Sequence, residues 1–233
     1  MAIDHRPSTT DHRPRTTDHR PRTTDHRPST IDLPRLYPIL DSSCFPDDRA
    51  LFQFAEDLFS AGVTLLQYRN KRGSPRQMLS HARELRRIAG RSARLIMNDR
   101  ADLCLAADFD GVHVGQDDLP PPAIRRIVGN QLWVGVSTHR PEQLREADQG
   151  DADYLAIGPV FATASKANPD PIVGLDGVRA SRALTKKPLV AIGGITRANA
   201  RSVIEAGADS VAVISDLLSD PRRAVEEFQR LLR

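Results

Sequence analysis

Residues 188–215 read PLVAIGGITRANARSVIEAGADSVAVIS, and this stretch decides the fold. An apolar run over 188–192 leads into Gly193 and Gly194, and a second apolar run covers 210–215. Between them, residues 196–206 have the length of a short helix, and Gly207 follows at the position where many helices end in glycine. A strand, a helix and a second strand in this order predict a βαβ unit with parallel strands.

The same alternation runs through the chain from Leu36 onward. Short apolar runs, which we interpret as strands, fall at 36–40, 63–69, 94–98, 111–114, 132–137, 153–158, 188–192 and 210–215. Each is followed by a helical segment, such as the 3.6-period stripe over 47–61 or the segments that begin at Ser74-Pro75 and Asp220-Pro221. Eight such units predict an α/β fold, a (β/α)8 TIM barrel, at about 200 residues near the small end of that class. An open doubly wound sheet is the alternative, and the lack of a G-x-G-x-x-G sequence after the first run disfavours it.

The N-terminal segment has a different character. Residues 4–31 are four copies of one heptapeptide, DHRPSTT, DHRPRTT, DHRPRTT and DHRPSTI. Because there is no apolar residue between Ile3 and Ile31, the segment cannot bury enough surface to offset its ordering entropy. We expect a disordered low-complexity tail over 1–34 and a single (β/α)8 catalytic domain over 35–233. Weak metal or anion binding by the His-Arg pairs is the functional alternative for the tail.

Composition excludes several classes of protein. No apolar run approaches the ~18 residues of a transmembrane helix, and the N-terminus lacks the apolar core of a secretory signal. Two cysteines, Cys44 and Cys104, cannot build a disulfide framework and suit a reducing, cytoplasmic location. The formal net charge is only +3, which gives no support for nucleic-acid binding. The expected partners are small-molecule substrates, with no nucleic acid and no membrane, and a homo-oligomer stays open.

Polar residues cluster where the second, third and fourth apolar runs end. Gln67, Arg69 and Lys71 are spaced by two, so they share one face of a strand and make an anion site. Asp99 follows the third run, and Asp117-Asp118 follow the fourth. Carboxylates at the ends of adjacent strands, together with substrate phosphate oxygens, are the usual ligands of Mg²⁺. Helix capping is the alternative role for these aspartates, and spacing does not decide between Asp117 and Asp118.

A second polar group follows the fifth to eighth runs. Ser137 ends the fifth, and a long loop with Thr163, Ser165 and Lys166 follows the sixth. Gly193 and Gly194 after the seventh run permit close approach of a phosphate to the backbone, at the place where this fold most often binds phosphate. His113 lies within an alternating strand, where a packed or hydrogen-bonded barrel histidine is the expected role and a catalytic histidine is the alternative. We find no Ser/His/Asp arrangement, so the residues favour electrostatic stabilisation of a departing pyrophosphate over covalent catalysis.

The chain resembles the thiamine-phosphate synthase family across 36–232. The matching segments are QYRNK (67–71), LIMNDRADL (95–103), DGVHVGQDDLP (110–120), GVSTH (135–139), DYLAIGPVFATASK (153–166), VAIGGIT (190–196) and AGADSVAVIS (206–215). The resemblance implies a (β/α)8 barrel, Mg²⁺ as cofactor and the condensation of 4-amino-2-methyl-5-(diphosphooxymethyl)pyrimidine with a thiazole phosphate. The implied products are thiamine monophosphate and pyrophosphate, formed by departure of pyrophosphate and attack of the thiazole nitrogen.

The resemblance also implies a role for individual residues. The pyrimidine diphosphate would be held by Gln67, Arg69, Lys71, Asn98, Ser137 and Lys166. The thiazole phosphate would be held by Thr163, Ser165, Gly194, Ile214 and Ser215. Arg69, Lys71, Ser137 and Lys166 would be the catalytic residues, and Asp99 and Asp118 would hold Mg²⁺, which selects Asp118 over Asp117. One departure is Ser165, where the family pattern T-x-T-K has threonine; the hydroxyl is retained.

Two other functions compete with this hypothesis. A thiazole tautomerase would share the fold but needs no diphosphate–metal site, so Gln67, Arg69, Lys71, Asp99 and Asp118 argue against it. A non-catalytic barrel that binds a phosphate ligand is the alternative from a different class, and the complete polar set disfavours it.

Overall fold

The structure is a computed structural model that describes residues 31–163 and 170–233. Within these ranges the strands are β1 Leu36–Asp41, β2 Leu65–Arg69, β3 Arg94–Asn98, β4 Gly111–Val114, β5 Trp133–Thr138, β6 Tyr154–Ile157, β7 Leu189–Ile192 and β8 Ser210–Val213. All are parallel and close into a barrel in sequence order, since β1 pairs with both β2 and β8. The predicted TIM barrel is confirmed, and closure rules out the open doubly wound sheet.

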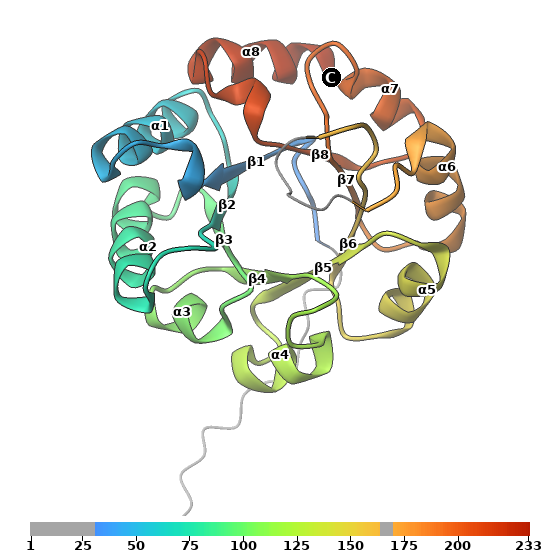
Figure 1. Ribbon diagram of the computed structural model, residues 1–233, viewed down its shortest axis with the longest axis horizontal. Helices are drawn as coiled ribbons and strands as arrows, with labels where there is room; N and C mark the ends of the chain where they lie inside the picture. Colours follow the sequence, from blue (N-terminus) through green and yellow to red (C-terminus); the bar gives the residue numbers. More distant parts are fainter. Residues whose placement is uncertain (1–30, 164–169) are drawn as a thin grey trace, which may run out of the picture.

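A helix follows each strand and packs on the outside of the barrel (Figure 1). The helices are α1 Asp48–Ser60, α2 Pro75–Ala89, α3 Ala101–Ala106, α4 Pro121–Val128, α5 Pro141–Gln149, α6 Gly174–Leu184, α7 Ala200–Glu205 and α8 Pro221–Leu231. In the part of the chain that the structure describes, α2 is the longest at 15 residues, and none of the helices has the length and apolarity needed to cross a membrane.

Local sequence explains where the helices begin. Asp47 and Ser74 accept hydrogen bonds from the backbone amides of Ala50 and Gln77 at 2.8 and 3.2 Å, and Pro75 occupies the first position of α2. The helix predicted over 196–206 is shorter, because Asn199 Oδ1 accepts from the Thr196 amide at 2.8 Å and holds a turn before α7 starts.

Side chains alternate between two cores. Those that point outward pack under the helices, and those that point inward fill the barrel. The inward set comprises Tyr37, Ile39, Leu65, Ile96, Trp133, Tyr154, Ala156, Val190 and Ala212. Ile31 and Leu33, each 8% exposed, join this set. The packed unit thus includes residues that the sequence analysis placed in the tail.

Three ion pairs brace the amino-terminal end of the barrel. Each joins an arginine of an even-numbered helix to an aspartate just before the next even-numbered strand: Arg86–Asp110, Arg125–Asp153 and Arg182–Asp209, at 2.5, 2.5 and 2.7 Å. The same aspartates accept the backbone N–H groups of Leu95, Val134 and Leu189 on the intervening strands, at 2.7, 2.7 and 2.8 Å. At each of three places around the barrel, one helix is therefore tied to two strands. These ties lie at the amino-terminal end, so the carboxyl ends of the strands are left for function.

Candidate active site

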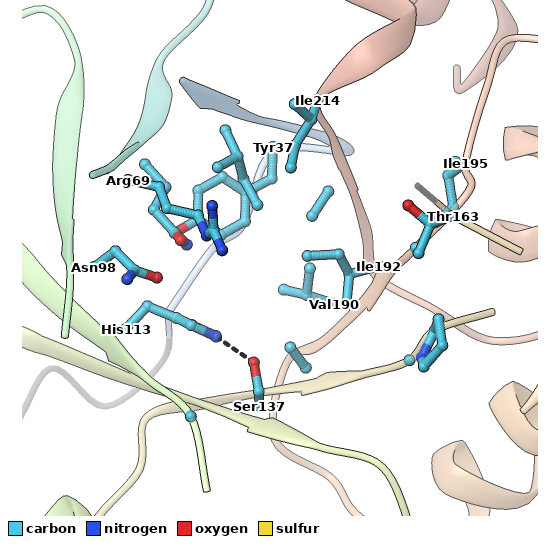
Figure 2. Close-up of a pocket in the computed structure, with 18 of the residues that line it drawn as sticks. Tyr37, Arg69, Asn98, His113, Ser137, Thr163, Val190, Ile192, Ile195 and Ile214 are labelled. Carbon is cyan, nitrogen blue, oxygen red and sulfur yellow. Dashed lines mark hydrogen bonds between the residues drawn. The ribbon is translucent and has the colours of Figure 1, made fainter. Parts of the chain in front are cut away.

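A pocket opens at the carboxyl ends of the strands, and the predicted site residues converge on it (Figure 2). Those that line it are Gln67, Arg69, Lys71, Asn98, Asp99, Asp118, Ser137, Thr163, Gly194, Ile214 and Ser215. Ser165 and Lys166 lie outside the described residues. Figure 2 shows Arg69, Asn98 and His113 on one side of the pocket and Thr163 and Ile195 on the opposite side. Two polar regions far apart in sequence thus face one space.

The end of β2 supplies the cationic part of the pocket. Gln67, Arg69 and Lys71 all reach the pocket, as their alternation predicts. The Arg69 guanidinium is held by an ion pair with Asp41 at the end of the neighbouring strand β1. Lys71 Nζ lies 2.5 Å from Asp99 Oδ2. Each cation is therefore positioned by a carboxylate at the end of an adjacent strand.

Asp99 and Asp118 form an acidic pair beside these cations. The pKa of the Asp99 carboxyl is raised, chiefly because burial disfavours its charge; the Asp118 carboxyl adds to the rise, and Lys71 opposes it. Asp118 Oδ2 also accepts the Gly115 amide at 2.8 Å, which points it into the pocket, whereas Asp117 is exposed and does not line it. Geometry thus places Asp118, of the two, at the site.

This acidic pair fits a hard divalent cation. Two facing carboxylates whose charges disfavour each other would be stabilised by a cation between them. The described chain contains no group of three or more His, Cys, Asp or Glu arranged for a metal. Mg²⁺ accepts such sparse protein ligands, because it commonly completes its octahedron with water and substrate phosphate. Asn98 Nδ2 beside the pair is buried and has no hydrogen-bond partner among the described residues, so a polar contact is available for a ligand.

The opposite side of the pocket is shaped by backbone. Gly193 and Gly194 have φ of +98° and +64°, and a Cβ on Gly194 would lie 2.4 Å from the Ala162 carbonyl oxygen. Only glycine fits where the β7 end passes this close to the loop after β6. The absence of side chains leaves backbone amides accessible to a phosphate, next to Thr163 and Ser215.

Ser137 and His113 meet in the pocket, which the sequence did not predict. His113 Nε2 lies 2.8 Å from Ser137 Oγ, as the dashed line in Figure 2 shows. On its other side, His113 contacts a phenol rather than a carboxylate, because its Nδ1 lies 3.0 Å from the Tyr154 hydroxyl. Burial lowers the pKa of His113 to about 4, so it is a weak base at neutral pH. The pair is therefore a poor nucleophile–base dyad. The expectation of a hydrogen-bonded barrel histidine is confirmed, but this histidine also lines the pocket.

Sequence reasoning missed Asp41 and Tyr37, which contribute to the site from β1. Both lie in an apolar run that indicates only a core strand. The available signal was alternation: Tyr37, Ile39 and Asp41 share the face of β1 that turns toward the barrel interior, and Asp41 sits at the carboxyl end.

Outside the pocket, a hydrogen-bond chain supports the loop that carries Lys71. Asp48 contacts His81 Nε2 at 2.9 Å, and His81 Nδ1 contacts the Tyr68 hydroxyl at 2.8 Å. Asn70 donates to that hydroxyl at 3.0 Å and accepts the amides of residues 72 and 73. The loop is thus tied to helices α1 and α2.

The thiamine monophosphate synthase family matches residues 36–217, which is most of the chain and the whole barrel up to the start of α8. The chain belongs to this family. The match includes every described residue that lines the pocket, from Tyr37 to Ser215. The predicted family and enzyme class are confirmed.

Members of the thiamine monophosphate synthase family align with this chain over nearly their full length. A thiamine-phosphate synthase of Koribacter versatilis is 62% identical over 205 residues, 87% of this chain and 97% of its own. One of Chloroflexus aurantiacus is 46% identical over 201 residues, 85% and 92% of the two chains. The solved thiamine phosphate pyrophosphorylase of Pyrococcus furiosus superposes with a TM-score of 0.76 at 34% identity, covering 85% of this chain and 95% of that one. Both sequence and fold therefore support thiamine-phosphate synthesis.

Proposed function

We propose that this synthase joins 4-amino-2-methyl-5-(diphosphooxymethyl)pyrimidine to a thiazole phosphate within the described pocket. The observation that carries the proposal is the pairing of two anion sites in one space. Arg69, Lys71 and the acidic pair lie at the ends of β2–β4, and the Gly194 backbone lies at the end of β7. A diphosphate at the first and a monophosphate at the second would bring the two rings together between them.

The reaction breaks one bond and forms another. The carbon–oxygen bond between the pyrimidine methylene and the diphosphate breaks, and its electron pair leaves with pyrophosphate. The thiazole nitrogen lone pair then forms the new carbon–nitrogen bond. Neither step needs a protein nucleophile, which agrees with the weak base at His113. The main task of the protein is to stabilise the leaving group and hold both rings in line.

Named residues would perform that task. Arg69, fixed by Asp41, and Lys71 would neutralise charge that develops on the departing pyrophosphate, together with Lys166, which lies outside the described residues. Asn98 and Ser137 would donate to the pyrimidine diphosphate, and Gln67 would contact it. Asp99 and Asp118 would hold Mg²⁺, which supplies positive charge to the diphosphate when bound. Thr163, Ser165, Gly194, Ile214 and Ser215 would hold the thiazole phosphate.

The test is an incubation of the full chain with both substrates and Mg²⁺. We expect thiamine monophosphate and pyrophosphate in equal amounts, and their loss on addition of a chelator. Arg69→Ala and Lys166→Ala should each lower turnover by two or more orders of magnitude, as about 3 kcal/mol of lost transition-state stabilisation requires. The control is Lys186→Ala, which removes an exposed cation before β7 at the opposite end of the barrel.

Other outcomes would contradict the proposal. Isomerised thiazole phosphate without condensation would support a tautomerase. Ligand binding without turnover would support a non-catalytic barrel. Unchanged turnover in both the Arg69 and Lys166 variants would overturn the residue assignment while leaving the activity in place.

We also place the enzyme in the cytoplasm, since its cysteines, Cys44 and Cys104, are both free.

A further inference from the structure

A chain of four hydrogen bonds crosses the barrel interior from β2 to β5. Gln67 Nε2 donates to the Tyr37 hydroxyl at 3.1 Å, and the Tyr37 and Tyr154 hydroxyls lie 3.0 Å apart. The Tyr154 hydroxyl contacts His113 Nδ1 at 3.0 Å, and His113 Nε2 contacts Ser137 Oγ at 2.8 Å. Its two ends, Gln67 and Ser137, both line the pocket. A continuous polar path therefore joins two parts of the site through residues that are not themselves assigned to substrate.

The middle of this chain is built into the core. Tyr37 and Tyr154 are 1% and 0% exposed, and their rings meet edge to face with centroids 6.2 Å apart. A Cβ on Gly135 would lie 2.1 Å from the Tyr154 ring, so a glycine on β5 makes room for it. Phenylalanine would fill the same space without a hydroxyl. A buried hydroxyl without a hydrogen-bond partner lowers the stability of the fold. The two tyrosine hydroxyls thus depend on each other and on His113 as partners.

Counting the protons favours one direction for the hydrogen bonds of this chain. Burial raises the pKa of both phenols, so each carries one proton. Because the Gln67 amide nitrogen donates to Tyr37, the Tyr37 proton is free to go to Tyr154. In that arrangement the Tyr154 proton goes to His113 Nδ1, and the single imidazole proton lies on Nε2, directed at Ser137. The reverse direction would leave the Tyr37 proton without an acceptor among the described residues. The four bonds use four protons, while the second amide hydrogen of Gln67 and the hydroxyl proton of Ser137 are not used within the chain.

We propose that Tyr37, Tyr154 and His113 are positioning residues. They fix which atoms of Gln67 and Ser137 donate hydrogen bonds to the ligand and which accept them on the pyrimidine side of the pocket. Since Nε2–H donates to Ser137 Oγ, the Ser137 proton is left for an acceptor atom of the ligand. Since the amide nitrogen of Gln67 is used by Tyr37, its oxygen is left to accept from a donor such as an amino group. The site thus selects a ligand with an N–H toward β2 and an acceptor toward β5. Only the identity of this ligand, the aminopyrimidine diphosphate, rests on the proposed function.

The tautomer of His113 tests the proposal without substrate. In the full chain labelled with ¹⁵N-histidine, we expect His113 to show a protonated Nε2 and an unprotonated Nδ1. His113→Gln assigns the signals by removing them. Tyr68→Phe is the matched control, because it removes a hydroxyl from the other buried Tyr–His pair, Tyr68–His81, on the outer side of β2. It should shift the His81 signals and leave those of His113 in place. A proton on Nδ1 of His113 would overturn the proposal.

A kinetic measurement tests the consequence for the ligand. Tyr154→Phe should release the fixed tautomer of His113 and raise KM for the pyrimidine diphosphate about tenfold, the effect of one misdirected hydrogen bond. KM for the thiazole phosphate should not change. An unaltered His113 spectrum together with an unaltered KM in this variant would contradict the proposal. If Tyr154→Phe does not fold, the wild-type tautomer still decides. The correct tautomer without any condensation would refute the proposed function alone, and condensation with the opposite tautomer would refute this inference alone.

Discussion

The backbone amide of Asp99 donates to the carbonyl oxygen of His113 over 2.8 Å. This bond extends the β3–β4 ladder one residue beyond β3, and Asp99 adopts a φ of +64° there. A left-handed conformation is uncommon for a non-glycine residue and is a known feature of functional sites. At this position it turns the Asp99 carboxylate toward Lys71 and the pocket. Backbone strain and the placement of a candidate metal ligand thus occur in the same residue.

The first prediction follows from this strain. Asp99→Gly should keep or raise the free energy of unfolding, by up to about 1 kcal/mol, because glycine adopts a positive φ freely. Formation of thiamine monophosphate should be lost. Asp108→Gly is the matched control, since Asp108 has a φ of +54° but lies in an exposed turn outside the pocket. It should gain stability and keep activity. Thermal unfolding and turnover of both variants provide the check; retained activity in Asp99→Gly would contradict the metal-ligand assignment.

The second prediction concerns the support of Arg69 by Asp41. Asp41 is 4% exposed and also accepts from Ser43, so the carboxylate is fixed in place. Asp41→Asn should raise KM for the pyrimidine diphosphate about tenfold and lower the free energy of unfolding by about 2 kcal/mol, since a charge-assisted bond is lost. Asp57→Asn removes the carboxylate of a surface pair with Arg222 and should cost less than about 1 kcal/mol without changing KM. Equal effects of the two substitutions on KM would argue against positioning by Asp41.

A third prediction separates the two substrates. Gly194→Ala places a methyl group against the Ala162 carbonyl and strains a backbone with φ of +64°. We expect KM for the thiazole phosphate to rise by an order of magnitude or more, with a small change for the pyrimidine diphosphate. Gly90→Ala provides the comparison, because Gly90 has a φ of +55° and open space around it. It should cost about 1 kcal/mol of stability through backbone strain alone and leave both KM values unchanged. Parallel rises in both KM values for Gly194→Ala would exclude a thiazole-specific role.

The fourth prediction concerns alkaline pH. Burial raises the pKa of the Cys104 thiol to about 12, and its sulfur donates to the Gly111 carbonyl at 3.3 Å. The contribution of this thiol to stability is complete below the unfolded pKa near 9 and is lost as pH rises toward 12. The loss over that interval is at most about 4 kcal/mol. Cys104→Ala should flatten this part of the curve of unfolding free energy against pH, and an unchanged slope would contradict the assignment. A thiol reagent should modify exposed Cys44 in the native protein and reach Cys104 only after unfolding.

A fifth prediction locates the boundary between tail and barrel. A variant that lacks residues 1–30 should keep its stability and activity. Removal of residues 1–34 also deletes the buried side chains of Ile31 and Leu33 and should cost about 3 kcal/mol by urea unfolding. The double substitution Ile31→Ser and Leu33→Ser in the full chain should reproduce that loss. Equal stability of the two truncated variants would show that these side chains contribute little.

Strand periodicity is strong in this chain, which is why so much of the fold and site could be predicted. Gln67, Arg69 and Lys71 share a face because side chains alternate in any strand, whatever surrounds it. Gly193 and Gly194 likewise mark a place where a side chain would not fit. By contrast, Asp117 and Asp118 are adjacent in sequence, and the hydrogen bond from the Gly115 amide orients Asp118 toward the pocket. No local pattern could distinguish between them.

The sequence by itself determined the order of strands and helices and the strand ends that carry function, because these follow from local periodicity. Only the tertiary structure decided which side chains meet. Tyr37 and Tyr154 are 117 positions apart, and each lies in an apolar run, yet barrel closure brings their hydroxyls within 3.0 Å. Ser137 and His113 also become partners only when β4 and β5 are in register, with His113 opposite Gly135. Such contacts depend on closure and register, which are properties of the assembled barrel.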